Sequence, residues 1–312
     1  MDISRLRVLR EFADRGSVTS AAQALHCTPS AVSQQLRALQ AEVGLQLTEP
    51  AGRGLRLTDA GRALVARADD VLAALDRAEA ELDAYRSQPR GRVRLALFPS
   101  AALMLLPGLL HRFAEFPGLE VDVSDADIQT QQVPALIADF DIVVSHRDEQ
   151  AEPFPADRLE VVYLLREPLD VALPPGHRLV GQKRVELTEL AEEPWIGVNE
   201  GFPVDDALRS LAVRTGVWPR PVHRTNDLRV IEALVAAGHG IALLPRYTMS
   251  PAVVGRPLAG LRAARHIEAV LRKGASARPA VATVLAALHA ESAAVTASPH
   301  RGAGPPRERP AP

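Results

Sequence analysis

Residues 21–39, AAQALHCTPSAVSQQLRAL, are the stretch that decides the fold. A short apolar helix ends in a turn at 26–28, after which Thr28 is a good helix N-cap and Pro29 a good first helical residue. The helix that follows has one apolar face, formed by Val32, Leu36, Leu39 and Val43. Its opposite face is polar and carries Ser30, Ser33, Gln34 and Arg37. Two helices joined by a tight turn, the second with a polar outer face, predict a helix-turn-helix.

The flanking residues complete a small, mainly helical domain over 1–60. An earlier helix, ended by Gly16, has apolar residues at helical spacing: Ile3, Leu6, Leu9 and Phe12. Between residues 48 and 57, Pro50, Gly52 and Gly54 lie between apolar ends. That pattern predicts a β-hairpin, which would be the wing. The whole domain is therefore expected to be a winged helix-turn-helix of the all-α class, with this hairpin beside its helices.

A long helix is predicted next, from a cap at Thr58 to about Ser87, within a linker segment over 58–88. Its apolar residues alternate steps of three and four: Leu64, Ala68, Val71, Leu75, Ala78, Leu82 and Tyr85. Such a seam is typical of helices that pair, and a helix of roughly 40 Å is too long to bury against so small a domain. We therefore expect a homodimer with contacts at Leu64, Val71, Leu75 and Leu82.

The remainder alternates strands and helices, which predicts an α/β domain over 92–290 with a mainly parallel sheet. Strands are expected at 93–98, 119–123, 141–145, 195–198 and 241–244, and helices at 101–115, 129–139, 204–214 and 227–237. Residues 159–174 look like two strands split by Glu167-Pro168. A returning strand at 266–271 and a closing helix at 279–289 give two lobes with a cleft, lobe I over about 92–165 and 265–290 and lobe II over about 168–263. The proline-rich residues 292–312 are expected to be a disordered tail.

Composition narrows the functional classes. The net charge is −2, but residues 1–67 hold nine arginines against six acidic residues. The single cysteine, Cys27, excludes an internal disulfide. For Cys27 itself, the role of a small packing residue beside the core is favoured over that of a redox sensor.

Localisation and enzyme class are also limited by the sequence. The first residues lack the apolar core of a signal peptide and no uninterrupted apolar run is long enough to span a membrane, so we expect a cytoplasmic protein without a membrane partner. GxSxG, P-loop and GxGxxG motifs are absent, and no His spacing suggests a metal, so neither an enzyme nor a cofactor is expected.

The helix-turn-helix stretch resembles that of LysR-type bacterial transcriptional regulators. Residues 44–47, Arg53-Gly54 and 57–61 are similar to the wing and linker start of that family, and 167–177 to the crossover between its effector lobes. Glu193-Pro194-Trp195-Ile196 and 236–245 are similar to hallmarks of its second lobe. The resemblance, over about residues 3–290, implies a C-terminal two-lobed domain resembling type 2 periplasmic binding proteins. It also implies double-stranded DNA, a small-molecule effector and a homodimer or homotetramer on an imperfect palindrome.

Several residues are candidates for DNA contact. Gln34 and Arg37 suit base edges, while Thr28, Pro29, Ser30 and Ser33 suit phosphate or mixed contacts; the alternative is an ordinary solvated face. The family usually has an aromatic residue and an arginine where this chain has Thr48 and Pro50. Arg53 or Arg56 is expected to replace that lost cation.

The candidates for effector contact follow predicted strand ends: Ser100, Ala101, Thr130, Ser145, Asn199, Phe202 and Thr225. Ser100 at a helix start suits an anionic or polar group, and His146 is a weaker candidate for the cleft. The alternative is that these residues are ordinary helix caps. Two other functional classes remain weaker: a two-lobed solute carrier, which the N-terminal 88 residues disfavour, and an enzyme.

Overall fold

The winged helix-turn-helix forms as the sequence predicts. The computed structural model describes residues 1–52, 54–84, 89–125, 132–154, 158–260 and 262–297. Helices α1 (Ile3–Arg15), α2 (Val18–Ala24) and α3 (Pro29–Val43) are capped by Asp2, Ser17 and Thr28. Strands β1 (Thr48–Ala51) and β2 (Gly54–Leu57) pair antiparallel as the wing. The predicted helix faces meet in one core, which contains Leu6, Leu9, Phe12, Val32, Leu36 and Leu39.

Cys27 lies differently from the expectation. It was expected to be a small packing residue beside the core, but its side chain is exposed. Cys27 lies in the turn between α2 and α3, next to His26, which has a left-handed backbone (φ 51°).

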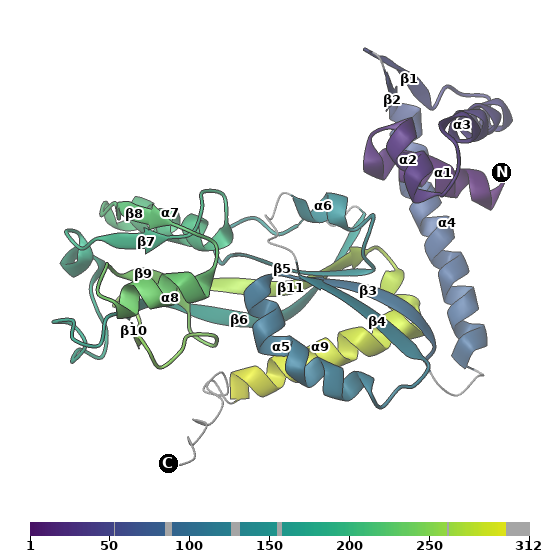
Figure 1. The fold of residues 1–312 in the computed structure, drawn as a ribbon. Helices are drawn as coiled ribbons and strands as arrows, with labels where there is room; N and C mark the ends of the chain where they lie inside the picture. Colours follow the sequence, from purple (N-terminus) through teal and green to yellow (C-terminus); the bar gives the residue numbers. More distant parts are fainter. Residues whose placement is uncertain (53, 85–88, 126–131, 155–157, 261, 298–312) are drawn as a thin grey trace.

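Some apolar residues of helix α4 (Asp59–Ala84) pack in the winged-helix core, some pack on the effector domain, and others are exposed to solvent. Val65 and Ala68 are buried in the winged-helix core, and the half-buried Leu64 packs there too, so Leu64 is used within its own domain. Further along, Leu72 and Ala73 are buried where α4 contacts helices η3 (Ala275–Ala277) and α9 (Pro279–Ala297). A Cβ on Gly274 would lie 2.7 Å from the Ala73 Cβ. The helix therefore packs on the effector domain of its own chain (Figure 1).

The effector domain is built on one mixed sheet. The sheet order is β10-β6-β11-β5-β3-β4, with β9 paired to β6. Its strands are β3 (Gly91–Leu97), β4 (Leu119–Asp125), β5 (Ile142–Asp148), β6 (Leu159–Leu173), β9 (Ala242–Pro245), β10 (Val254–Arg256) and β11 (Ala264–Arg272). Among the described strands of this sheet, β3 runs parallel to β4 and to β5 and the other pairs are antiparallel, so the expected mainly parallel sheet is wrong. A separate two-stranded sheet pairs β7 (Trp195–Gly197) with β8 (Pro221–Arg224) in parallel. The returning strand β11 lies between β5 and β6 and is antiparallel to both.

Lobe I contains α5 (Pro99–Phe113), α6 (Val133–Leu136) and α9 around β3, β4, β5 and β11. Lobe II contains η2 (Leu187–Leu190), β7 (Trp195–Gly197), α7 (Pro203–Thr215), β8 (Pro221–Arg224) and α8 (Leu228–Ala236), with β9 and β10. The two strands expected over 159–174 are one strand, β6, which both lobes share. It pairs with β11 up to Pro168 and with β9 from Leu169, so the predicted break is the point where β6 changes partners.

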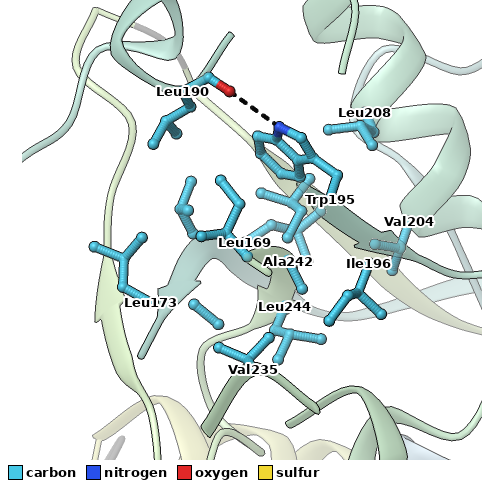
Figure 2. Close-up of a cluster of buried hydrophobic side chains, with 14 of the residues drawn as sticks. Leu169, Leu173, Leu190, Trp195, Ile196, Val204, Leu208, Val235, Ala242 and Leu244 are labelled. Atoms are coloured by element: carbon cyan, nitrogen blue, oxygen red, sulfur yellow. Dashed lines mark hydrogen bonds between the residues drawn. The ribbon is translucent and has the colours of Figure 1, made fainter. Parts of the chain in front are cut away.

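Trp195 anchors the core of lobe II. Its side chain is fully buried among residues that include Leu169, Leu208 and Leu244, and its indole N–H donates to the Leu190 carbonyl at 3.2 Å (Figure 2). Gly240, in the loop after α8, has φ 156°, and a Cβ there would lie 2.5 Å from the Pro194 carbonyl oxygen. The two sequence hallmarks at 193–196 and 236–245 are therefore in contact with each other.

Helix α9 is longer than predicted. It continues to Ala297, so residues 292–297, expected to belong to a disordered tail, are helical, and residues 298–312 lie outside the described residues. Among the described residues α9 is the one helix long and apolar enough to cross a membrane by length and composition. It contacts α5, β3 and β6 and buries Val281, Val284 and Leu288 in lobe I. In this fold it is a core helix.

Candidate functional site

The outer face of α3 is the first candidate site. Pro29, Gln34 and Arg37 are exposed. Thr28 Oγ1 accepts from the Ala31 N–H at 3.2 Å and lies 2.9 Å from Ser30 Oγ, so both hydroxyls help to begin the helix. Ser33 is half-buried, and its carbonyl accepts from Arg37 Nε at 3.3 Å. The arrangement leaves Gln34 and the end of Arg37 facing solvent on one exposed surface.

The wing has one described candidate cation, Arg56. Arg53 lies outside the described residues. Arg56 Nε donates to Glu49 Oε1 at 2.8 Å, with both side chains exposed. Thr48, at the position of the missing aromatic residue, donates its hydroxyl to Gln40 Oε1 at 3.1 Å. Arg56 would have to leave Glu49 to contact a phosphate.

A cavity of about 510 Å³ between the lobes is the second candidate site. Three helices begin at it: α5 contributes Pro99 and Ser100, α7 contributes Phe202 and Val204, and α8 contributes Asp227 and Leu228. Helices α5 and α7 lack a side-chain cap, whereas Asp227 caps α8 by accepting from the Arg229 N–H. Uncapped first turns present backbone N–H donors and the positive end of the helix dipole. The remaining polar lining includes Asp125, Asn226, Arg229, Glu232 and Thr248.

Arg265 forms the polar floor of this cavity. Its side chain is 2% exposed, and Glu167 holds it through Nε at 2.9 Å and Nη2 at 2.7 Å. Arg265 Nη2 also donates to Ser100 Oγ at 2.8 Å, and Nη1 lies 3.2 Å from His146 Nδ1. A buried guanidinium requires such partners, because an unpaired buried charge is costly. The floor therefore joins β11, β6, β5 and the start of α5.

His146 is kept neutral at this floor. Its ring lies 4.1 Å from the Phe98 ring, and the Arg265 guanidinium lies 5.0 Å from that same ring. Burial, and secondly the charge of Arg265, hold the pKa of His146 well below its ordinary value. Because Nδ1 faces an arginine N–H, we assign the imidazole proton to Nε2. His146 lies within β5 and not after its end, but it does line the cavity.

The predicted effector residues separate into two groups. Ser100 and Phe202 line the cavity. Ala101 is fully buried in the lobe I core, and Ser145 is fully buried with no hydrogen-bond partner for its Oγ among the described residues. Asn199 and Thr225 are outside the cavity lining. The Asn199 N–H donates to Asn226 Oδ1, and the Thr225 N–H donates to the Gly197 carbonyl. Thr130 lies outside the described residues.

Sequence reasoning missed the central residue of the floor. Arg265 comes at the start of a strand, in the run Ala264-Arg265-His266-Ile267, and one charged residue there is usually solvent-exposed. Glu167 belongs to the stretch 167–177 that resembles the crossover. The signal in the sequence was a charged residue inside each of two strands, but the pairing of Arg265 with Glu167 depends on the antiparallel register of β6 and β11.

Comparison with known proteins identifies the family of both domains. Residues 3–62 match the family described as bacterial regulatory helix-turn-helix protein, lysR family, and residues 86–293 match the LysR substrate binding domain. The chain is 32% identical to the HTH-type transcriptional regulator TtuA of Agrobacterium vitis, over 82% of this chain and 84% of that protein. It is 31% identical to a probable hydrogen peroxide-inducible genes activator of Mycobacterium avium, over 83% and 82%.

A solved structure shares the fold across nearly the whole chain. Full-length CbnR complexed with its target DNA is 23% identical, with a TM-score of 0.53, over 94% of this chain and all of that one. The match to the family covers both the helix-turn-helix and the two lobes. The chain belongs to the LysR family of transcriptional regulators, with a DNA-binding helix-turn-helix domain and an effector-binding domain, and it is not an enzyme.

Proposed function

We propose that α3 reads an operator while a small effector occupies the cavity between the lobes. The observation that supports this most is the cavity itself, where α5 of lobe I and α7 and α8 of lobe II begin at one space. A ligand that contacts both lobes favours one relative arrangement of them through its differential affinity. DNA contact is assigned to Thr28, Pro29, Ser30, Ser33, Gln34 and Arg37, with Arg53 on the wing. The protein would act in the cytoplasm, where the DNA lies.

The assembly is proposed to be a homodimer, or a tetramer made of such dimers. Val71 is 45% and Leu82 66% exposed on α4, on the seam that the sequence predicts for pairing. An apolar seam left in solvent is a typical contact surface. Exposed Leu103 and Leu110 on α5 and Val222 on β8 are available for contacts between effector lobes. Two symmetric winged helices would require an imperfect palindrome.

A ligand is favoured over oxidation of a thiol as the signal. Peroxide acts on proteins chiefly by oxidising cysteine thiolates. The only cysteine, Cys27, precedes α3, and the effector domain contains none. The relatives described as hydrogen peroxide-inducible activators therefore indicate the family of this chain and not its signal.

Removal of Arg37 tests the DNA surface. Arg37→Ala is expected to weaken binding to the upstream DNA of the protein's own gene by about 1–3 kcal/mol and to lower specificity, because a base contact is lost. Fluorescence anisotropy at several salt concentrations measures this. Arg67→Ala removes the same charge from an exposed position on α4 and should have little effect. Equal affinities for Arg37→Ala and the unmodified chain would remove Arg37 from the interface.

Removal of the Ser100 hydroxyl tests the effector site. A thermal-shift screen of small metabolites on the full chain first identifies a ligand. Ser100→Ala should then weaken its binding by about 0.5–3 kcal/mol, without changing ligand-free affinity for DNA. Thr188→Ala is the matched control, since Thr188 is an exposed hydroxyl residue on η2, outside the cavity lining. Undiminished ligand affinity in Ser100→Ala would place the effector elsewhere.

A further inference from the structure

A second cavity lies between the DNA-binding domain and lobe I of the same chain. Its volume is about 150 Å³, and α1, α4 and lobe I all contribute to it. Five cationic side chains line it: Arg10, Arg94, Arg272, Lys273 and Arg278. Three carboxylates line it as well: Glu11, Asp69 and Asp141. Its lining therefore has an excess of positive charge.

The three carboxylates already have close cationic partners. Asp141 accepts from Arg278 at 2.6 Å, Asp69 from Arg158 at 2.6 Å and Glu11 from Arg15 at 3.1 Å. Arg15 and Arg158 are not part of the lining. Glu11 and Asp69 are therefore paired with arginines outside the cavity, and these pairs use none of the five lining cations. Of the lining cations, Arg272 is held by Asp14 at 2.6 Å. Each lining carboxylate thus has one close cationic partner, although Asp69 Oδ1 is buried without a hydrogen bond among the described residues, and part of the positive charge has no carboxylate partner.

Arg10, Arg94 and Lys273 are the cations left over, and Arg94 is a 51% exposed side chain that lies 3.9 Å from Asp141, which Arg278 already holds. Arg10 Nε is buried without a hydrogen-bond partner among the described residues, and the ion pair of its Nη2 with Glu11 is long, at 3.9 Å. Burial, followed by the charge of Arg272, lowers the pKa of Arg10. Lys273 has no carboxylate within 4.0 Å in the part of the chain that the structure describes. Arg10 comes from α1 and Lys273 follows β11, so the two cations belong to different domains.

We propose that this cavity binds a small divalent oxyanion, such as phosphate or sulfate, between Arg10 of the DNA-binding domain and Lys273 of lobe I. A guanidinium presents a fork of N–H donors that fits a tetrahedral oxyanion, and an ammonium adds a point charge. A cavity of about 150 Å³ has room for one such ion and for little else. The ion contacts both domains, so its occupancy stabilises this orientation of the winged helix. The site is separate from the cavity between the lobes.

Melting of the full chain in defined salts tests the proposal. Low millimolar sulfate or phosphate should raise the melting temperature by roughly 2–4 °C over sodium chloride of equal ionic strength. Arg10→Met and Lys273→Met should lose most of that rise. Lys183→Met is the matched control, because Lys183 is the only other lysine and is exposed on lobe II. A rise with phosphate alone, or with sulfate alone, supports the site and identifies which ion it holds.

A second readout separates a binding role for Arg10 from a structural one. In chloride alone, Arg10→Met should melt no lower than the unmodified chain, since it removes a buried charge that lacks partners. A lower melting temperature there would show that Glu11 already satisfies Arg10 and would overturn the proposal. The same rise in all four proteins would show a general salt effect and would also overturn it, as would no rise in any of them.

Discussion

At the residue scale, a few buried charges decide how the effector domain is held together. The pair of Arg265 with Glu167 links β11 to β6 where the lobes meet, and Glu167 also accepts from the Tyr247 N–H at 3.2 Å. A buried ion pair is weak evidence for stability, but it fixes geometry because breaking it leaves an unpaired charge. Ser100 and His146 are therefore held at fixed positions in the cavity floor.

His146 should make stability depend on pH. Burial lowers the pKa of His146 in the folded chain, whereas the unfolded chain takes up that proton near its ordinary value of about 6.5. Below that pH the unfolded state binds more protons, so the free energy of unfolding falls as pH falls, by up to about 1.4 kcal/mol per pH unit. Above about pH 6.5 His146 is neutral in both the folded and the unfolded chain, so it no longer lowers the free energy of unfolding.

Urea unfolding between about pH 7.5 and 5.5 measures this dependence, over the range in which histidine titrates. His146→Gln, which can still accept from Arg265, should flatten the profile. His223→Gln, at an exposed position on β8, should leave it unchanged. Identical slopes for the His146→Gln and unmodified proteins would contradict the assignment.

At the element scale, the apolar residues of α4 fall into two groups, one packed within its own chain and one exposed to solvent. Leu72 and Ala73 pack on the effector domain of the same chain, while Val71 and Leu82 lie exposed. The heptad seam predicts pairing along the whole helix, but its first residues are used in the winged-helix core. The part of α4 available for a partner is therefore its C-terminal half.

Charge on the exposed seam should break the dimer and leave the protomer folded. Leu82→Asp is expected to raise the dissociation constant of the dimer by about 10²-fold or more, because two leucines lose their burial and two carboxylates face each other. Sedimentation velocity measures the dimer and urea unfolding the protomer. Val213→Asp changes a residue that is 72% exposed on α7 and is the control. A dimer of unchanged affinity in Leu82→Asp would place the interface elsewhere.

At the scale of the whole molecule, ion pairs connect the DNA-binding domain to lobe I. Asp14 of α1 lies 2.9 Å from Arg158 and 2.6 Å from Arg272, and Arg158 also holds Asp69 of α4 at 2.6 Å. Arg15 pairs with Asp139 at 2.7 Å. Since the side chain of Asp14 is 8% exposed, this contact is less screened than a surface pair. These ion pairs therefore connect α1 directly to lobe I.

Loss of the Asp14 charge should loosen this contact. Asp14→Asn leaves Arg158 and Arg272 without their shared partner, so a protease should cut severalfold faster after Arg90, just before β3, as expected for a segment that opens locally. Limited proteolysis with mass spectrometry measures the rate. Asp70→Asn, which removes an exposed carboxylate of α4, is the control. Equal cleavage rates for Asp14→Asn and the unmodified chain would contradict the role of the contact.

The sequence by itself determines the helix-turn-helix, the wing, the long helix and the two-lobed class, because these depend on local caps, turns and periodicity. The position of Ser100 and Phe202 in the cavity lining follows from the same local signals, since each comes just before a predicted helix. Only the tertiary structure decides that β11 returns antiparallel between β5 and β6, that Arg265 meets Glu167, and that α4 packs on lobe I. Those facts depend on strand register and on contacts between distant residues, which local patterns do not encode. The exposed Cys27 and the helical residues 292–297 show the same limit, because burial and helix length depend on packing around them.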